Sequence, residues 1–151
     1  MSIGLHHSVV IYPASTVIFK DGDTRNAMYI VTKGQIAIFK ITPQNERIPL
    51  GIVGSGEYLA ETGLLDNKPT HATWAVALTD VELICIPAEA ILEQMKTAPQ
   101  WLVALSRGLS QKLRKMNDIV RRNKLSDNSL DHAMEAAIRN ELKRKGSRDG
   151  T

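Results

Sequence analysis

Residues 54–74 read Gly-Ser-Gly-Glu-Tyr-Leu-Ala-Glu-Thr-Gly-Leu-Leu-Asp-Asn-Lys-Pro-Thr-His-Ala-Thr-Trp, and they lie between two runs with strand character. The middle of this stretch, Ala60–Leu65, predicts a single helical turn. The backbone N–H groups that begin such a turn have no partner within it, so they favour an anion. The stretch therefore predicts a loop that presents donors to a negatively charged group.

On both sides of this loop, β-branched and aromatic residues form short runs separated by turn residues, which is typical of strands. The expected strands are residues 8–12, 16–20, 28–32, 35–41, 47–53, 73–78 and 81–86. Lys33-Gly34 and Thr79-Asp80 predict two-residue hairpin turns, and Gly34 is free to adopt positive φ. Short strands at this spacing predict an all-β sandwich or barrel.

After Pro87 the pattern becomes helical. Residues 88–97 predict a short helix, Ala98-Pro99 breaks it, and a long helix runs from Gln100 to about Lys124. Apolar residues recur along the long helix at steps of three, four, four, three and four, which is a narrow coiled-coil-like seam: Leu102, Leu105, Leu109, Leu113, Met116 and Val120. We expect the N-terminal part of the seam to pack on the barrel. The remainder is expected to form a homodimer, with contacts from Leu105, Leu109, Leu113, Met116 and Val120.

The last part of the chain is basic. Residues 106–151 hold twelve Lys/Arg and six Asp/Glu, whereas residues 1–105 hold seven and ten, so the net charge of +3 comes from the C-terminal third. Leu130, Met134, Ile138 and Leu142 predict a short amphipathic helix. We expect one domain over residues 1–124 and a basic helix and tail over 125–151. A solvated charged face is the simplest interpretation of the tail, and a protein partner is the alternative.

Several function classes are disfavoured. No nucleophile elbow, phosphate-binding P-loop or zinc-protease motif is present, so we expect no catalytic residues, no metal site and no cofactor. The single cysteine, Cys85, fits a reducing cytoplasm. The N-terminus has no signal-peptide pattern, and no apolar run reaches the roughly 20 residues of a membrane span, so a cytoplasmic protein is expected.

Together, residues 17–23, 28–38, 54–74 and 75–87 resemble the cyclic nucleotide-binding domain family, as found in catabolite activator proteins and kinase regulatory subunits. The resemblance covers about residues 8–124. It implies a mainly β fold with C-terminal α-helices, in which a jelly-roll β-barrel is followed by a long dimerisation helix. The family's transcription factors continue into a helix-turn-helix. Only about 27 residues follow Lys124, so we expect no sequence-specific DNA binding.

The resemblance also implies a site. In the family, a glutamate bonds the ribose 2′-hydroxyl, while backbone N–H groups and an arginine hold the cyclic phosphate. The ligand-binding residues implied here are Ala60, Glu61, Thr62, His71, Ala72, Thr73 and, on the long helix near the base, Asn117. Glu61 matches the glutamate. Ala60 replaces a glycine, His71 replaces the arginine, and Ala72-Thr73 replaces a Ser/Thr-Ala pair. Histidine is mostly neutral near pH 7, so Lys68 and the Thr73 hydroxyl are candidate substitutes.

Two functions remain open. The first is a stand-alone sensor or regulatory module that binds cAMP or cGMP in the cassette and signals through its C-terminal helices. The alternative is a degenerate cassette that binds no cyclic nucleotide, in a dimeric protein-interaction scaffold that uses the basic C-terminal helix. An enzyme of the cupin barrel type is disfavoured, because metal-binding histidine pairs inside strands are absent.

Overall fold

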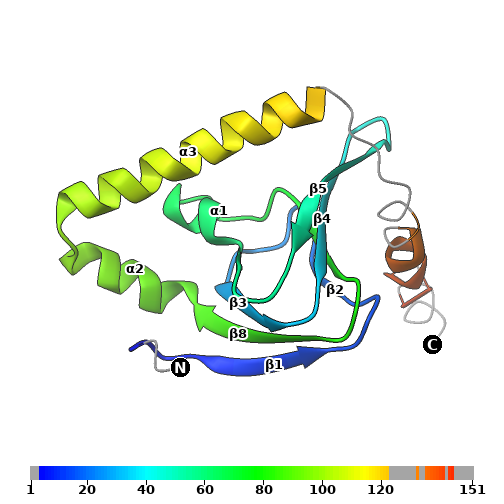
Figure 1. The fold of residues 1–151 in the computed structure, drawn as a ribbon, viewed down its shortest axis with the longest axis horizontal. Helices are drawn as coiled ribbons and strands as arrows, with labels where there is room; N and C mark the ends of the chain where they lie inside the picture. Colours follow the sequence, from blue (N-terminus) through cyan, green and yellow to red (C-terminus); the bar gives the residue numbers. More distant parts are fainter. Residues whose placement is uncertain (1–3, 123–131, 133–134, 142, 145–151) are drawn as a thin grey trace.

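The computed structural model describes residues 4–122, 132, 135–141 and 143–144, with the side chains of 117–122 left out (Figure 1). These residues form two antiparallel sheets, with strand orders β1-β8-β3-β6 and β2-β7-β4-β5. The strands are β1 (Ser8–Tyr12), β2 (Val17–Phe19), β3 (Ala27–Lys33), β4 (Ile36–Ile41), β5 (Arg47–Val53), β6 (Tyr58–Leu59), β7 (Trp74–Ala77) and β8 (Val81–Pro87). The prediction of a mainly β jelly roll with C-terminal helices is confirmed.

The strand positions match the predicted ones closely, except that β6 was not predicted. Two residues are too few to show an alternating pattern, and β6 exists because it pairs with β3. The two predicted hairpin turns are wrong. β3 and β4 belong to different sheets, and so do β7 and β8. The turns therefore cross between the sheets instead of joining paired strands.

These two crossings touch each other at Gly34. Its φ is 90°, which is the left-handed region that glycine adopts without steric cost. A Cβ at this position would overlap the backbone carbonyl of Asp80 and the side chains of Thr79 and Val81. Gly34 is therefore needed both for its backbone angle and for the close approach of the second crossing.

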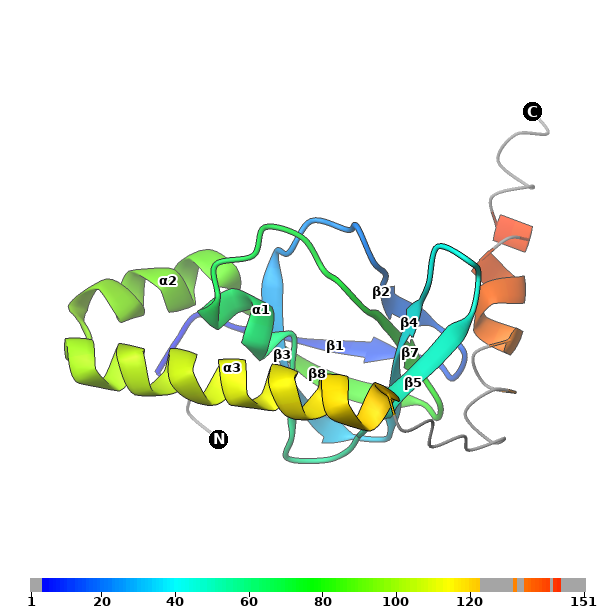
Figure 2. The same cartoon turned by 90° about the horizontal axis from the view of Figure 1, so that it is seen from above.

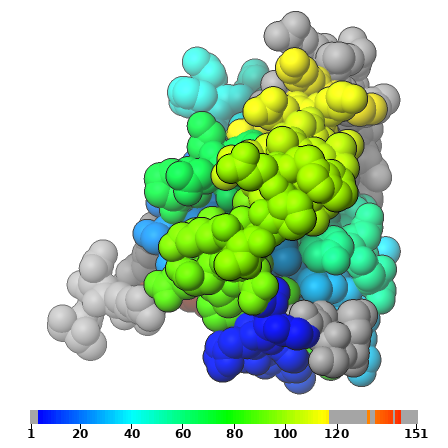
Figure 3. Space-filling view, turned by 90° about the vertical axis from the view of Figure 1, so that its left-hand side faces the viewer, coloured from blue at the N-terminus to red at the C-terminus, as the bar shows by residue number. Residues whose placement is uncertain are grey.

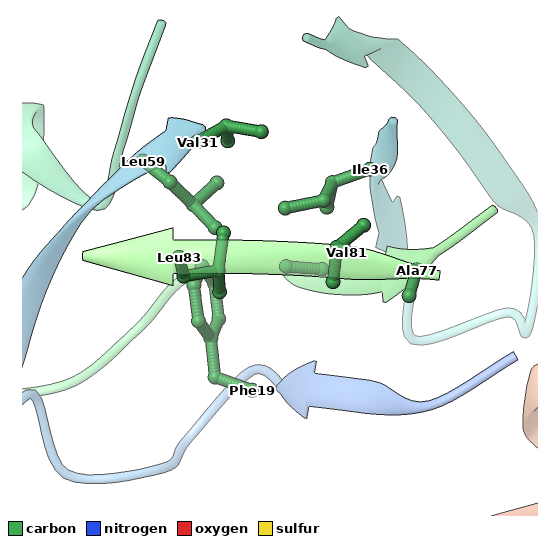
Figure 4. Close-up of a cluster of buried hydrophobic side chains, with 8 residues drawn as sticks. Phe19, Val31, Ile36, Leu59, Ala77, Val81 and Leu83 are labelled. Carbon is green, nitrogen blue, oxygen red and sulfur yellow. The ribbon is translucent and has the colours of Figure 1, made fainter. Parts of the chain in front are cut away.

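The space between the sheets holds the main hydrophobic core (Figure 4). It contains the buried residues Phe19, Val31, Ile36, Leu59, Ala75, Ala77, Val81 and Leu83. Strand alternation explains which residues face this core, because successive side chains point to opposite faces of a sheet. In β7, Ala75 and Ala77 face this core, while Trp74 and Val76 face outward.

The outer face of the β2-β7-β4-β5 sheet is also apolar, and a helical segment at residues 135–141 covers it (Figures 1 and 2). Ala137 is fully buried against Phe39 and Val76. An ion pair lies near each end of the segment. Glu135 is 3.4 Å from Arg47, and Glu141 is 3.4 Å from Lys20. The predicted boundary at residue 124 lies outside the described residues, and so do Leu130, Met134 and Leu142 of the predicted short amphipathic helix.

The two predicted central helices are confirmed as α2 (Ala88–Thr97) and α3 (Gln100–Arg122), which cover one end of the molecule in Figure 3. Ala98 between them is extended, with ψ of 150°, because the following residue, Pro99, disfavours the helical conformation. Within the described residues, no helix is both long enough and apolar enough to cross a bilayer.

The expected packing of α3 is partly wrong. Its seam residues do not pack on the barrel at their N-terminal end: Leu102 is 42% exposed and Leu105 is 52% exposed. Leu109, Leu113 and Met116 are exposed as well. The helix instead contacts the rest of the domain through polar residues, and its apolar seam faces outward.

We expect Ala137→Glu to lower the free energy of unfolding by about 1–3 kcal/mol, because a carboxylate has no partner between Phe39 and Val76. Urea unfolding followed by tryptophan fluorescence measures this effect. Asn140→Glu, at an exposed position of the same segment, is the matched control and should change stability little. Equal effects of the two substitutions would contradict the described docking.

Candidate functional site

The predicted cassette is a crossing between the two sheets. β6 lies in one sheet and β7 in the other, so residues 60–73 must bridge them. The loop at residues 20–26 bridges the same sheets in the opposite direction, and backbone hydrogen bonds join the two segments. The Gly22 N–H donates to the His71 carbonyl, the His71 N–H to the Asp23 carbonyl and the Arg25 N–H to the Pro69 carbonyl, each at 2.9 Å. The cassette is therefore held by a distant part of the chain.

The predicted helical turn is confirmed as α1 (Glu61–Leu65). Ala60 precedes it with φ of 69° and ψ of 9°, a left-handed conformation. An L-residue other than glycine pays roughly 1–2 kcal/mol for this conformation. The left-handed backbone at Ala60 explains why glycine would suit this position, and it shows that the cassette keeps its shape without one.

Glu61 is the first residue of α1 and is partly buried. Burial raises the pKa of its carboxyl, while a hydrogen bond from its own backbone N–H and the nearby charge of Arg25 act in the opposite direction. A carboxylate at this place is thus poorly solvated. A hydrogen-bond donor on a ligand would therefore stabilise the charged form of Glu61.

His71 is 4% exposed, and its ring lies flat on Phe19, with the ring centroids 3.8 Å apart and the planes 12° apart. Burial and, to a smaller extent, the charge of Arg25 lower the pKa of His71 to about 4, although the charge of Asp23 opposes the shift. The imidazole is therefore neutral at pH 7. It lines a hollow of about 280 Å³ together with Phe19, Asp23 and Tyr29.

The other predicted site residues are distributed around the cassette. Thr62 lies on α1 next to Glu61, Thr73 is partly buried just before β7, and Ala72 is exposed. Asn117 belongs to α3, but its side chain lies outside the described residues. The structure brings Ala60, Glu61 and Thr62 together at the start of α1 and directs the His71 ring toward Phe19. The ligand contacts of all seven residues stay a prediction.

The sequence analysis missed Arg25, whose guanidinium lies inside the cassette. Nη1 donates to the Ala60 carbonyl at 2.8 Å, Nε to the Lys68 carbonyl at 3.1 Å and Nη2 to the Thr70 carbonyl at 3.1 Å. Arg25 comes 36 positions before Glu61 and lies just outside residues 17–23, the nearest stretch that carries the resemblance. No local signal could have linked the two residues, because only the paired crossings bring them together.

The polar face of α3 holds the other end of α1. The Arg107 Nε donates to the Leu65 carbonyl at 3.1 Å, and the buried Ser110 hydroxyl donates to the Thr62 carbonyl at 3.2 Å. Arg114 forms an ion pair of 2.8 Å with Asp66, the residue that ends α1. Cations complement the exposed carbonyls at the C-terminal end of a helix. α1 is therefore fixed directly to the long helix.

Charged groups of both signs surround α1. The cations Arg25, Lys68, Arg107 and Arg114 and the carboxylates Glu61 and Asp66 lie on α1 or next to it, and the loop at residues 20–26 adds Lys20, Asp21 and Asp23. The cations favour an anionic ligand, and the carboxylates oppose it. Among the residues that the structure describes, no cluster of His, Cys, Asp and Glu is arranged to hold a metal ion.

Two packed sheets bridged by a cassette that carries Glu61 define a cyclic-nucleotide-binding type of jelly roll. A family model described as the cyclic nucleotide-binding domain matches residues 9–98. The chain belongs to this family. Among curated relatives, the "Cyclic AMP receptor protein" of Thermus thermophilus is 32% identical over 104 residues, which are 69% of this chain and 48% of the relative. The chain spans about half the length of the curated relatives it matches.

Solved structures agree on the fold. The cAMP-bound form of the EAL enzyme Bd1971 is 30% identical with a TM-score of 0.64, over 85% of this chain and 33% of that one. The sensor domain of the transcriptional regulator DNR from Pseudomonas aeruginosa has a TM-score of 0.63 at 22% identity, over 80% of this chain and 79% of that one. At 22% identity, the similarity to the DNR sensor domain shows the fold alone.

The depressed pKa of His71 predicts that stability falls in acid. The imidazole binds a proton at pH 6.5 when unfolded but only near pH 4 when folded, so the unfolded state takes up more protons between these values. We expect the free energy of unfolding to fall by about 2 kcal/mol between pH 7 and pH 5 on account of this residue. Urea unfolding of His71→Phe, which keeps the stack on Phe19, should lack this component. His6→Gln, at an exposed position, should retain it. A wild-type profile that His71→Phe leaves unchanged would contradict the assignment.

Proposed function

We propose that the chain is a sensor or regulatory module that binds cAMP or cGMP in the cassette and signals through its C-terminal helices. The observation that carries this proposal is the position of α1. The turn that begins with Glu61 is bonded at its other end to Arg107, Ser110 and Arg114 of α3. A ligand that moves α1 by a fraction of an ångström must therefore also displace α3 or break these bonds.

Within this proposal, the Glu61 carboxylate accepts a hydrogen bond from the ribose 2′-hydroxyl, and the cations next to α1 attract the cyclic phosphate. His71 does not supply the charge, because its pKa of about 4 keeps it neutral at pH 7. The module is a regulator of the cytoplasm and not a catalyst. The cAMP-bound form of the similar enzyme Bd1971 supports a cyclic nucleotide as the ligand.

The proposal includes a homodimer through α3. The exposed apolar residues of this helix are Trp101, Leu102, Leu105, Leu109, Leu113 and Met116. From Leu102 onward they are spaced by three and four positions, so they form one stripe. A stripe of this length on a soluble helix marks an interaction face, and a second copy of α3 offers the same spacing.

A second candidate is supported by two observations of the cassette. His71, in the position where the family has an arginine, is turned onto Phe19, and Arg25 already occupies the carbonyls of the cassette. On this hypothesis the cassette is empty, and the protein is a dimeric scaffold that binds a protein partner through its basic C-terminal helix. Calorimetry with cyclic nucleotides separates the two candidates.

We expect cAMP or cGMP to bind saturably in isothermal titration calorimetry, and Glu61→Gln to weaken binding about tenfold to a hundredfold. A hydrogen bond to a charged group contributes roughly 1.5–3 kcal/mol, and the amide retains the shape but not the charge. Glu46→Gln, in the exposed loop between β4 and β5, is the control and should bind as the wild type does. No heat with either nucleotide at millimolar concentration would support the scaffold.

We expect the wild type to sediment as a dimer and Leu109→Asp to sediment as a monomer, because two carboxylates would meet in the apolar stripe. Leu109 is 54% exposed, so the substitution should not disturb the fold of one protomer. Gln111→Asp, an exposed neighbour outside the stripe, should remain dimeric. Sedimentation velocity distinguishes these states. A monomeric wild type at tens of micromolar would refute the helix dimer.

A further inference from the structure

The guanidinium of Arg25 joins both sides of the cassette. One side is the Ala60 carbonyl, immediately before α1, and the other side is formed by the carbonyls of Lys68 and Thr70, after α1. The three bonds use three of the five N–H donors of the side chain. They also come from three different nitrogen atoms in one plane. The side chain therefore acts as a rigid spacer across the loop.

Gly63 lies directly against the guanidinium of Arg25. A Cβ built on Gly63 would overlap the guanidinium nitrogen and carbon atoms of Arg25. Gly63 lies within α1 and does not have a positive φ, so its backbone conformation is open to other residues. Space for Arg25 is thus the physical reason for a glycine at this position.

Lysine could not replace Arg25 in this arrangement. Its ammonium is a compact point charge with strong hydration, whereas the guanidinium is a planar fork with donors at fixed angles. The three carbonyls surround the plane of the fork. An ammonium that reached the Ala60 carbonyl could not also bond the carbonyls of Lys68 and Thr70, so it would not join the two sides of the cassette.

We propose that Arg25 is the positioning residue of the cassette: by bonding the Ala60 carbonyl it fixes the backbone that carries Glu61, and by bonding the opposite side it sets the width of the loop. The positioning of a ligand by this clamp rests on the proposed function, whereas the clamp itself does not. Because Arg25 belongs to the loop at residues 20–26, its side chain also ties the cassette to that loop.

The clamp is tested first without any ligand, by urea unfolding of a double-mutant cycle. Gly63→Ala should lower the urea midpoint by about 1 M in the wild type, since the added methyl displaces the guanidinium. In the Arg25→Ala background the same substitution should have little effect, because the space is free. Gly108→Ala, on α3 where a Cβ meets nothing within 4 Å, is the control and should not lower the midpoint. Additive effects of Gly63→Ala and Arg25→Ala would overturn the clamp.

The positioning of Glu61 is tested by ribose selectivity. The wild type should bind cAMP about tenfold to a hundredfold more tightly than 2′-deoxy-cAMP, because only cAMP offers the hydroxyl to Glu61. Arg25→Gln, and Arg25→Lys as a second variant, should reduce this ratio to below about threefold. Arg47→Gln removes an arginine that pairs with Glu135 away from the cassette and should keep the ratio.

The outcomes are distinct. If Arg25→Gln weakens both ligands equally, Arg25 only stabilises the fold and the positioning role is wrong. If the wild type binds cGMP and not cAMP, the same comparison is made with cGMP and 2′-deoxy-cGMP. If it binds neither cAMP nor cGMP, the proposed function is wrong, and the unfolding cycle alone decides whether the clamp exists. Circular dichroism of each variant identifies a variant that has lost its fold, and Arg25→Lys then replaces Arg25→Gln in the comparison.

Discussion

The site depends on one constraint: β6 and β7 belong to different sheets, so the chain between them must cross the open end of the sandwich. A free crossing of this length would leave backbone groups without partners. The second crossing, at residues 20–26, supplies them through three backbone hydrogen bonds and the side chain of Arg25. The conformation of the cassette therefore depends on tertiary contacts and not on its local sequence alone. Its shape comes from a segment about 40 positions away.

α1 connects this crossing to the rest of the domain. Arg25 holds the residue that precedes it, and the polar face of α3 holds its last carbonyls and Asp66. Because the polar face of α3 is used inward, its apolar residues are left outward. This arrangement suits the proposed sensor role, since an element that packs with polar bonds on the site and presents an apolar surface to a partner can transmit a small displacement between them.

The outer face of the β2-β7-β4-β5 sheet is also covered by a segment that is distant in the chain. Phe39 and Val76 point away from the main core and would face water without the segment at residues 135–141. Their burial explains why a short C-terminal segment packs on this sheet through Ala137 and Ile138, with an ion pair near each end. The basic third of the chain thus contributes acidic and apolar residues to the fold.

The sequence by itself determined the strands, the helices and the family, because each depends on local signals. Alternation marked the strands, the step of three and four marked the seam, and Pro99 marked the break before α3. It also located Glu61 at the start of a helical turn. It could not assign strands to sheets, since turn residues such as Lys33-Gly34 suit a hairpin and a crossing equally well.

Only the tertiary structure decided which charges meet in the cassette. Arg25 enters it because two distant crossings pair, and the His71 ring is neutral because it is buried on Phe19 near the charge of Arg25. The direction of the seam of α3 was decided in the same way, by the bonds that Arg107, Ser110 and Arg114 make to α1. Hydrogen bonds between residues far apart in the chain leave no periodic trace in the sequence, and these bonds build the site.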